Sequence, residues 1–111
     1  MKIPINTPIV GKEEISVVTS IIKKGEFTSS VNHGGKYVQD FEKSVSSFVN
    51  AKYTVAVNSG TAALQAALYA LNIKQGDEVL IPSFTFVATA NSVYSTGAKP
   101  VFVDILKEFY I

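Results

Sequence analysis

A turn rich in small residues is the part of this sequence best suited to bind a ligand. Ser59, Gly60, Thr61 and Ala62 lie between an apolar run and a helix-forming run. The first turn of a helix offers free backbone N–H groups and the positive end of the helix dipole, and both attract a phosphate. Gly60 would let the backbone approach such a ligand, and Thr61 adds a hydroxyl. The turn therefore predicts a phosphorylated ligand, although spacing alone also fits an ordinary N-cap at Ser59.

A second candidate segment, residues 82–91, follows the next predicted strand. Ligands of parallel α/β sheets bind outside the carboxyl ends of the strands. Phe84 and Phe86 could present a flat apolar face to an aromatic ring there, and Thr89 and Asn91 could supply polar contacts. The ordinary alternatives are that both phenylalanines belong to the core and that Thr89 and Asn91 lie on a helix surface.

The remaining polar residues form no recognisable catalytic set. His33 is the single histidine and lies in a polar loop, so we expect it to be exposed rather than catalytic or metal-binding. Asp77 and Glu78 are neighbours in a turn and do not form a converging acid–base pair. The turn at Gly60 also lacks the glycine patterns of dinucleotide and nucleoside-triphosphate sites. We predict no metal site.

Hydrophobic periodicity indicates the elements that must position these residues. Helices are expected over residues 12–24, 36–49, 61–71 and 85–95, and strands over 53–57, 78–81 and 100–105. From residue 53 onward, strands alternate with helices, which indicates βαβ units and a chiefly parallel sheet. A sheet of three strands leaves exposed edges. We therefore expect the chain to be part of a larger fold.

Composition excludes several classes of partner. The 111 residues are 47% apolar and 17% charged, with a net charge of +1, which argues for a folded core and against disorder. All ten basic residues are lysines, so the chain has no arginine for bidentate recognition of phosphate. The charges are interspersed and no apolar run is long enough to span a bilayer, so we predict neither a nucleic acid nor a membrane partner. The lack of cysteine fits a reducing compartment, and we expect a cytoplasmic protein.

Four motifs, taken together, resemble a known family. They are SGTAAL at 59–64, GDEVLIP at 76–82, TFVATAN at 85–91 and GAKPVFVD at 97–104. Their order and separation are similar to those of the DegT/StrS family, which are pyridoxal-phosphate-dependent aminotransferases of nucleotide-linked keto-sugars. GEFTS at 25–29 and Phe41-Glu42 also look like the family's leading segment. The resemblance implies an α/β fold, namely the large domain of the aspartate-aminotransferase-like fold (PLP fold type I), with a chiefly parallel or mixed sheet flanked by helices.

The resemblance also implies roles for individual residues. The turn residues 59–62 match the positions around the cofactor phosphate, and Phe86 matches the aromatic residue that stacks on the pyridine ring. Thr28, Ser29 and Thr89 are candidates for substrate contacts. The implied reaction moves an amino group from L-glutamate to a nucleotide-linked keto-sugar through pyridoxal phosphate, as polysaccharide biosynthesis requires.

Family members carry two further groups downstream: an acidic residue facing the pyridine nitrogen and a lysine that forms the Schiff base. Both would lie beyond Ile111, so no catalytic residue is assigned within the chain. We expect 1–111 to be the N-terminal portion of the PLP-binding large domain, with an arm and two helices in 1–52 and a βαβαβ unit in 53–111. Such a fragment should be inactive alone, and the complete enzyme should be a homo-oligomer. The alternative is a non-catalytic α/β module that binds a phosphorylated ligand or a partner protein.

Overall fold

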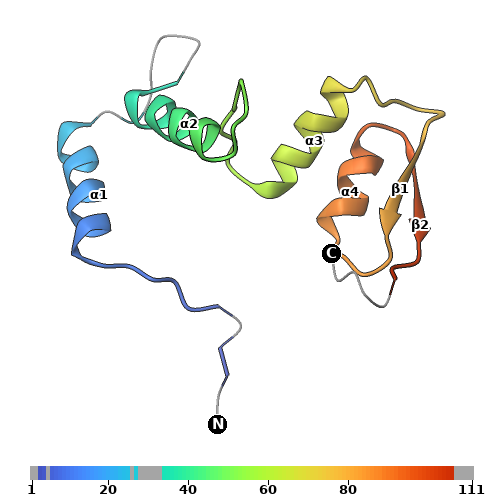
Figure 1. Ribbon diagram of the computed structural model, residues 1–111, viewed down its shortest axis with the longest axis horizontal. Coiled ribbons are helices and arrows are strands. Elements are labelled where there is room, and N and C mark those ends of the chain that lie inside the picture. Colours follow the sequence, from blue (N-terminus) through green and yellow to red (C-terminus); the bar gives the residue numbers. More distant parts are fainter. Residues whose placement is uncertain (1–2, 5, 26, 28–33, 107–111) are drawn as a thin grey trace. The chain divides into compact units, whose positions relative to one another are not determined.

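The chain forms two compact units, Met1–Ala56 and Val57–Ile111, shown in Figure 1. The computed structural model describes residues 3–4, 6–25, 27 and 34–106. The predicted substrate contacts Thr28 and Ser29, and the loop residue His33, lie outside the described residues. Within the described part of the chain, no helix is long and apolar enough to cross a membrane.

The first unit begins with helix α1, Lys12–Lys24, as the apolar spacing predicts. The helix starts where the Gly11 N–H donates a hydrogen bond to Glu14 Oε2 over 2.7 Å. Backbone N–H donors at Glu14 itself and at Gly11 lower the pKa of this carboxyl group. The helix ends at Gly25, whose φ of 68° lies in the left-handed region that glycine adopts without strain. The predicted helix over residues 12–24 is confirmed with both of its ends.

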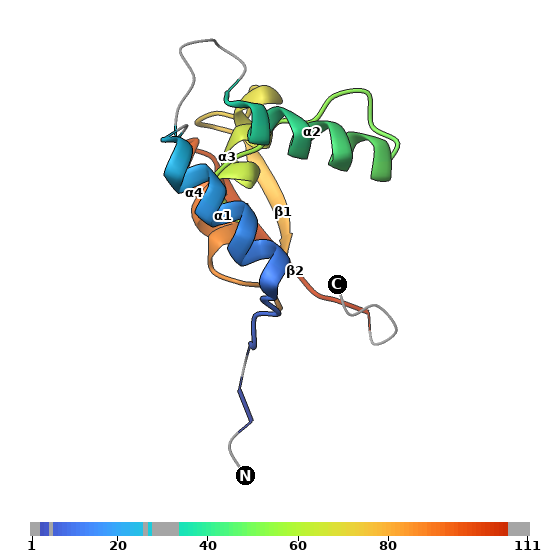
Figure 2. The same cartoon turned by 90° about the vertical axis from the view of Figure 1, so that its left-hand side faces the viewer.

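Helix α2, Lys36–Phe48, is tied to the chain that follows it. Figure 2 shows this chain turning back after the helix. The N–H of Ala56 donates to Glu42 Oε1 over 2.8 Å, and both residues are partly buried. This bond joins positions 14 residues apart, so it fixes the backbone just before the second unit begins.

The second unit is one βαβ motif preceded by a helix. Its elements are α3 (Gly60–Ala70), β1 (Glu78–Pro82), α4 (Ala88–Ser95) and β2 (Lys99–Val103). The strands are parallel, and their register runs from the pair Glu78 and Lys99 to the pair Pro82 and Val103. The first pair also forms an ion pair of 2.7 Å, and this hydrogen bond raises the pKa of Lys99. The parallel pairing confirms the predicted sheet direction.

A small apolar cluster holds α4 against the two strands. Ile81, Val93 and Ala98 are its buried members, and Leu68, Ile73, Val79 and Ala90 pack against them. Gly97 makes the connection from α4 to β2 with a φ of 82°, a conformation that other residues rarely adopt. The cluster therefore fixes the position of the first turn of α4 relative to the carboxyl ends of the two strands.

The predicted strand over residues 53–57 is wrong for the described structure. The segment has no strand pairing, and Tyr53 and Val55 remain 79% and 78% exposed. A strand exists only when its backbone groups pair with a neighbour. Here the Ala56 N–H bonds to the Glu42 carboxylate, and the described sheet holds β1 and β2 alone. The expected βαβαβ unit is therefore a single βαβ motif.

Several predicted boundaries also shift. α4 begins at Ala88 rather than at residue 85, because the preceding residues form a bend, in which the Phe86 carbonyl accepts from the Thr89 N–H and the Thr85 hydroxyl bonds to that of Thr89. β1 includes Pro82, one residue beyond its expected end, because the neighbouring Ser83 N–H continues the pairing with the Val103 carbonyl over 3.0 Å. The later start of α4 leaves Phe86 in the loop.

We predict that the Glu42 bond stabilises the first unit. Glu42→Ala removes a charged acceptor from a partly buried N–H and should lower the free energy of unfolding by about 1.5–3 kcal/mol. Hydrogen exchange at the Ala56 N–H should become faster. Glu42→Gln keeps an acceptor oxygen and should have a smaller effect. Lys43→Ala, at the next and exposed position, serves as the control; equal effects of Glu42→Ala and Lys43→Ala on unfolding would contradict the prediction.

Candidate functional site

The second unit gathers the predicted ligand-binding residues at one end. Figure 1 shows α3 and α4 both beginning at the end of this unit where β1 and β2 finish. A cleft of about 580 Å³ opens there between the first turns of the two helices. Its lining residues are Gly60, Thr61, Ala63, Leu64, Phe86, Ala88 and Thr89. The turn proposed for a phosphate and the ring proposed for stacking thus face the same space.

The first turn of α3 has free hydrogen-bond donors. Ser59 is the N-cap: its Oγ accepts from the Ala62 N–H over 3.1 Å, and its carbonyl accepts from the Ala63 N–H over 3.0 Å. The N–H groups of Gly60 and Thr61 have no acceptor among the residues that the structure describes, and neither has the Thr61 hydroxyl. Three donors that belong to cleft-lining residues therefore remain for an anion.

Ser59 and Ala62 contribute differently from what the sequence suggests. Both were expected to surround the phosphate, but neither lines the cleft. The Ala62 N–H is already donated to Ser59, so this pair shapes the turn. The N-cap that spacing alone suggests is present at Ser59, and it coexists with the free donors of the next two residues.

Gly60 has no conformational reason to be glycine. It is the first residue of α3, it does not have a positive φ, and a Cβ built there would meet nothing within 4 Å. Glycine inside a helix is destabilising by roughly 0.5–1 kcal/mol relative to alanine. The glycine leaves an open position at the mouth of the cleft, beside the free donors. This is the arrangement that a close-approaching ligand requires.

The opposite wall of the cleft carries Phe86. Its ring is 76% exposed, and its carbonyl accepts from the Thr89 N–H over 3.0 Å, which fixes the loop just before α4. The hydroxyls of Thr85 and Thr89 are 2.9 Å apart and close the same loop from the side. Phe84 is 71% exposed and does not line the cleft. Burial of both rings in the core, the alternative left open by the sequence, is therefore wrong for the described structure.

The groups of the cleft that could face an anion belong to its backbone rather than to charged side chains. No lysine or acidic residue is among its lining residues. The N-terminal end of the α3 dipole, with its free N–H groups, supplies the positive potential. Beside it, the cleft has an apolar surface made by Ala63, Leu64, Phe86 and Ala88. A phosphate joined to a flat aromatic ring fits this combination of groups.

Sequence reasoning missed three lining residues, Ala63, Leu64 and Ala88. A helical signal could have found two of them, because Ala63 and Leu64 follow Gly60 by three and four positions and so share its face. Ala88 could not be found, because the start of α4 was expected three residues earlier.

Comparison with known proteins places this chain in a family. Residues 8–111 match the DegT/DnrJ/EryC1/StrS aminotransferase family. The chain is 48% identical to the spore coat polysaccharide biosynthesis protein SpsC of Bacillus subtilis over 103 residues. This stretch is 93% of this chain and 25% of SpsC. It is 39% identical to GDP-perosamine synthase of Vibrio cholerae over 103 residues, 93% of this chain and 27% of that protein. The chain spans about a quarter of the length of these curated relatives.

The fold agrees with these similarities. The structure of Spr1654 from Streptococcus pneumoniae in its PLP form superposes with a TM-score of 0.85 at 31% identity, covering 98% of this chain and 26% of that chain. The predicted fold class is therefore confirmed, as is pyridoxal phosphate as the cofactor of the family. From the family match and these likenesses together, the chain is a member of the DegT/DnrJ/EryC1/StrS aminotransferase family.

Proposed function

We propose that residues 1–111 are the N-terminal part of the cofactor-binding domain of a sugar aminotransferase. The complete enzyme would move an amino group from L-glutamate to a nucleotide-linked keto-sugar. The observation that supports this most is the cleft in which the free N–H groups of Gly60 and Thr61 face the same space as Phe86. Membership of the family supports the reaction class, and the relative named as a GDP-perosamine synthase favours a sugar carried on a nucleotide.

The residues of the cleft would divide the work of holding pyridoxal phosphate. Gly60 and Thr61 would bind the phosphate through their N–H groups and the Thr61 hydroxyl, and Phe86 would lie against the ring. When bound, the cofactor supplies the electron sink of the reaction. Thr89 lines the cleft beside Phe86, so it can contact a substrate that approaches the ring. Thr28 and Ser29 stay candidates for substrate contacts.

Other parts of the machinery would come from outside this chain. No lysine is among the cleft-lining residues, so we place the lysine that binds the cofactor covalently beyond Ile111. We also propose that the complete enzyme is a homo-oligomer, since α1 has no buried residue among those described and exposes Ile15, Val18 and Ile22. A cytoplasmic location fits the lack of cysteine.

The proposed reaction can be tested directly on the complete enzyme. The protein, loaded with pyridoxal phosphate, is incubated with L-glutamate and a panel of nucleotide-linked keto-sugars. We expect one amino sugar and one 2-oxoglutarate to form per turnover. Replacing L-glutamate with L-aspartate tests the donor, and replacing the sugar nucleotide with the free keto-sugar tests the carrier. If no keto-sugar on the panel is converted to an amino sugar, the proposal is contradicted.

Three variants separate the two walls of the cleft. In the complete enzyme, Thr61→Ala removes a hydroxyl that would donate to the phosphate. Cofactor binding should weaken by about 1–2 kcal/mol, on the order of tenfold. Phe86→Ala should weaken it by roughly 0.5–1.5 kcal/mol through lost stacking. Phe84→Ala is the matched control, because Phe84 is nearly as exposed as Phe86 but lies outside the cleft lining. The affinity of each variant is measured by titration with the cofactor. If Phe84→Ala lowers the cofactor affinity and Phe86→Ala does not, the stacking ring is Phe84 rather than Phe86.

Gly60→Ala should have opposite effects on stability and on binding. Alanine is the better helix former, so the free energy of unfolding should stay the same or rise by up to about 1 kcal/mol. The melting temperature should follow it. The added methyl group would occupy open space at the cleft, and cofactor affinity should fall on the order of tenfold, which is about 1.4 kcal/mol. Gly35→Ala is the control: Gly35 precedes α2, has a φ of −74° and is likewise uncrowded. Unchanged cofactor affinity in Gly60→Ala would show that the ligand does not approach this residue.

The 111-residue chain by itself should carry no covalent attachment point for the cofactor. Borohydride reduction in the presence of pyridoxal phosphate should leave no stoichiometric adduct on any of its ten lysines. Mass spectrometry of the reduced and digested protein gives the answer. Modification of a single lysine in stoichiometric yield would mean that a covalent site lies within the chain.

A further inference from the structure

Ser92 is a polar residue buried where α3 and α4 meet. It is 1% exposed. Its hydroxyl donates to the Ala88 carbonyl over 2.7 Å and lies 3.5 Å from the Thr61 carbonyl. Ala88 and Thr61 line the cleft from different helices. One buried hydroxyl therefore contacts the backbone of both walls.

A serine at this point serves two physical purposes. It is small, so the first turns of the two helices can approach each other closely. Its single proton can be donated to either carbonyl, over 2.7 Å to Ala88 within α4 or over 3.5 Å across to Thr61 of α3. A larger side chain would push the helices apart, because a buried contact has no spare volume. An alanine would keep the approach but remove the polar contact.

We propose that Ser92 is a positioning residue that sets the separation between the phosphate-binding turn and the stacking ring. The inference rests on the proposed function, since it concerns a ligand that spans both walls. In pyridoxal phosphate the ring and the phosphate are held at a nearly fixed distance. Full affinity then requires that Thr61 and Phe86 stand at the matching distance. Inorganic phosphate needs the α3 side alone and should be indifferent to this spacing.

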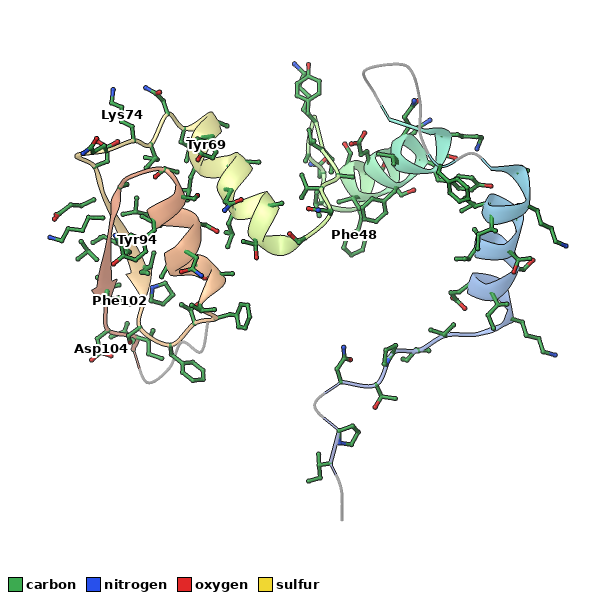
Figure 3. The ribbon with its side chains drawn as sticks, turned by 180° about the vertical axis from the view of Figure 1, so that it is seen from behind. Phe48, Tyr69, Lys74, Tyr94, Phe102 and Asp104 are labelled. Carbon is green, nitrogen blue, oxygen red and sulfur yellow. The ribbon has the colours of Figure 1, made fainter. Side chains whose placement is uncertain are left out.

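A second contact between the same helices supplies a matched control. The Tyr69 hydroxyl of α3 donates to the Ser95 carbonyl of α4 over 2.7 Å. Figure 3 shows Tyr69 at the opposite end of this unit from Asp104, which follows the carboxyl end of β2. Tyr69→Phe therefore removes a hydroxyl that ties α3 to α4 far from the cleft. Ser92→Ala removes one beside it.

The experiment compares Ser92→Ala, Ser92→Val and Tyr69→Phe in the complete enzyme. For each variant we would measure the affinities for pyridoxal phosphate and for inorganic phosphate, the melting temperature, and the visible circular dichroism of the bound cofactor. Ser92→Ala should lower the affinity for pyridoxal phosphate roughly threefold, and Ser92→Val should lower it on the order of tenfold or more. Inorganic phosphate should bind as before, and the dichroism should change with ring orientation. Tyr69→Phe should lower the melting temperature while both affinities stay unchanged.

The ratio of the two affinities is the deciding quantity, because a general loss of stability would not change it. An unchanged ratio in both Ser92 variants, or equal weakening of both ligands, would overturn the proposal. If Ser92→Val does not fold, the comparison of Ser92→Ala with Tyr69→Phe decides in the same way. The proposed function is tested separately by Thr61→Ala: if this change leaves both ligands unaffected, the cofactor site itself is misplaced.

Discussion

Two backbone N–H groups at the start of α3 have no acceptor among the described residues, and the rest of the site depends on them. Gly60 and Thr61 donate to nothing in the described chain, whereas Ala62 and Ala63 are both satisfied by Ser59. Unpaired donors next to an apolar cleft are costly unless water or a ligand takes them. A phosphate is the ligand that matches them in charge and geometry. The chain has no arginine, so it offers no bidentate guanidinium for a phosphate.

The fold serves mainly to bring a second wall to these donors. Pairing of β1 with β2 and burial of Ile81, Val93 and Ala98 place α4 against the sheet. The loop before α4 then carries Phe86 to the cleft, held by bonds within residues 85–89. Among the described residues, the apolar cluster has only three buried members, and Leu80 remains 69% exposed. A parallel sheet is ordinarily covered on both faces, which agrees with a chain that spans about a quarter of its relatives' length.

The sequence predicted the parts of this structure that local chemistry determines. α1 and its stop at Gly25 follow from helical spacing and from the conformational freedom of glycine. The N-cap at Ser59 and the parallel direction of the strands follow from equally local rules. Phe86 reaches the cleft as predicted, because it follows the carboxyl end of β1.

What could not be predicted depends on partners distant in the sequence. The run 53–57 has the composition of a strand, but a strand needs a neighbour, and its Ala56 N–H pairs with Glu42 instead. The choice between Phe84 and Phe86 depends on where α4 begins, which hydrogen bonds within a single bend decide. Ser92 carries no sequence signal at all, because its burial arises only when α3 crosses α4.

A crystal structure of the complete enzyme with pyridoxal phosphate tests the central claim most directly. The account predicts phosphate oxygens at about 2.7–3.2 Å from the N–H nitrogens of Gly60 and Thr61, with the Phe86 ring against the pyridine ring. Gly60 and Thr61 would then gain the acceptors that they lack among the described residues. A phosphate bound elsewhere, with protein oxygens accepting from these two N–H groups, would contradict it.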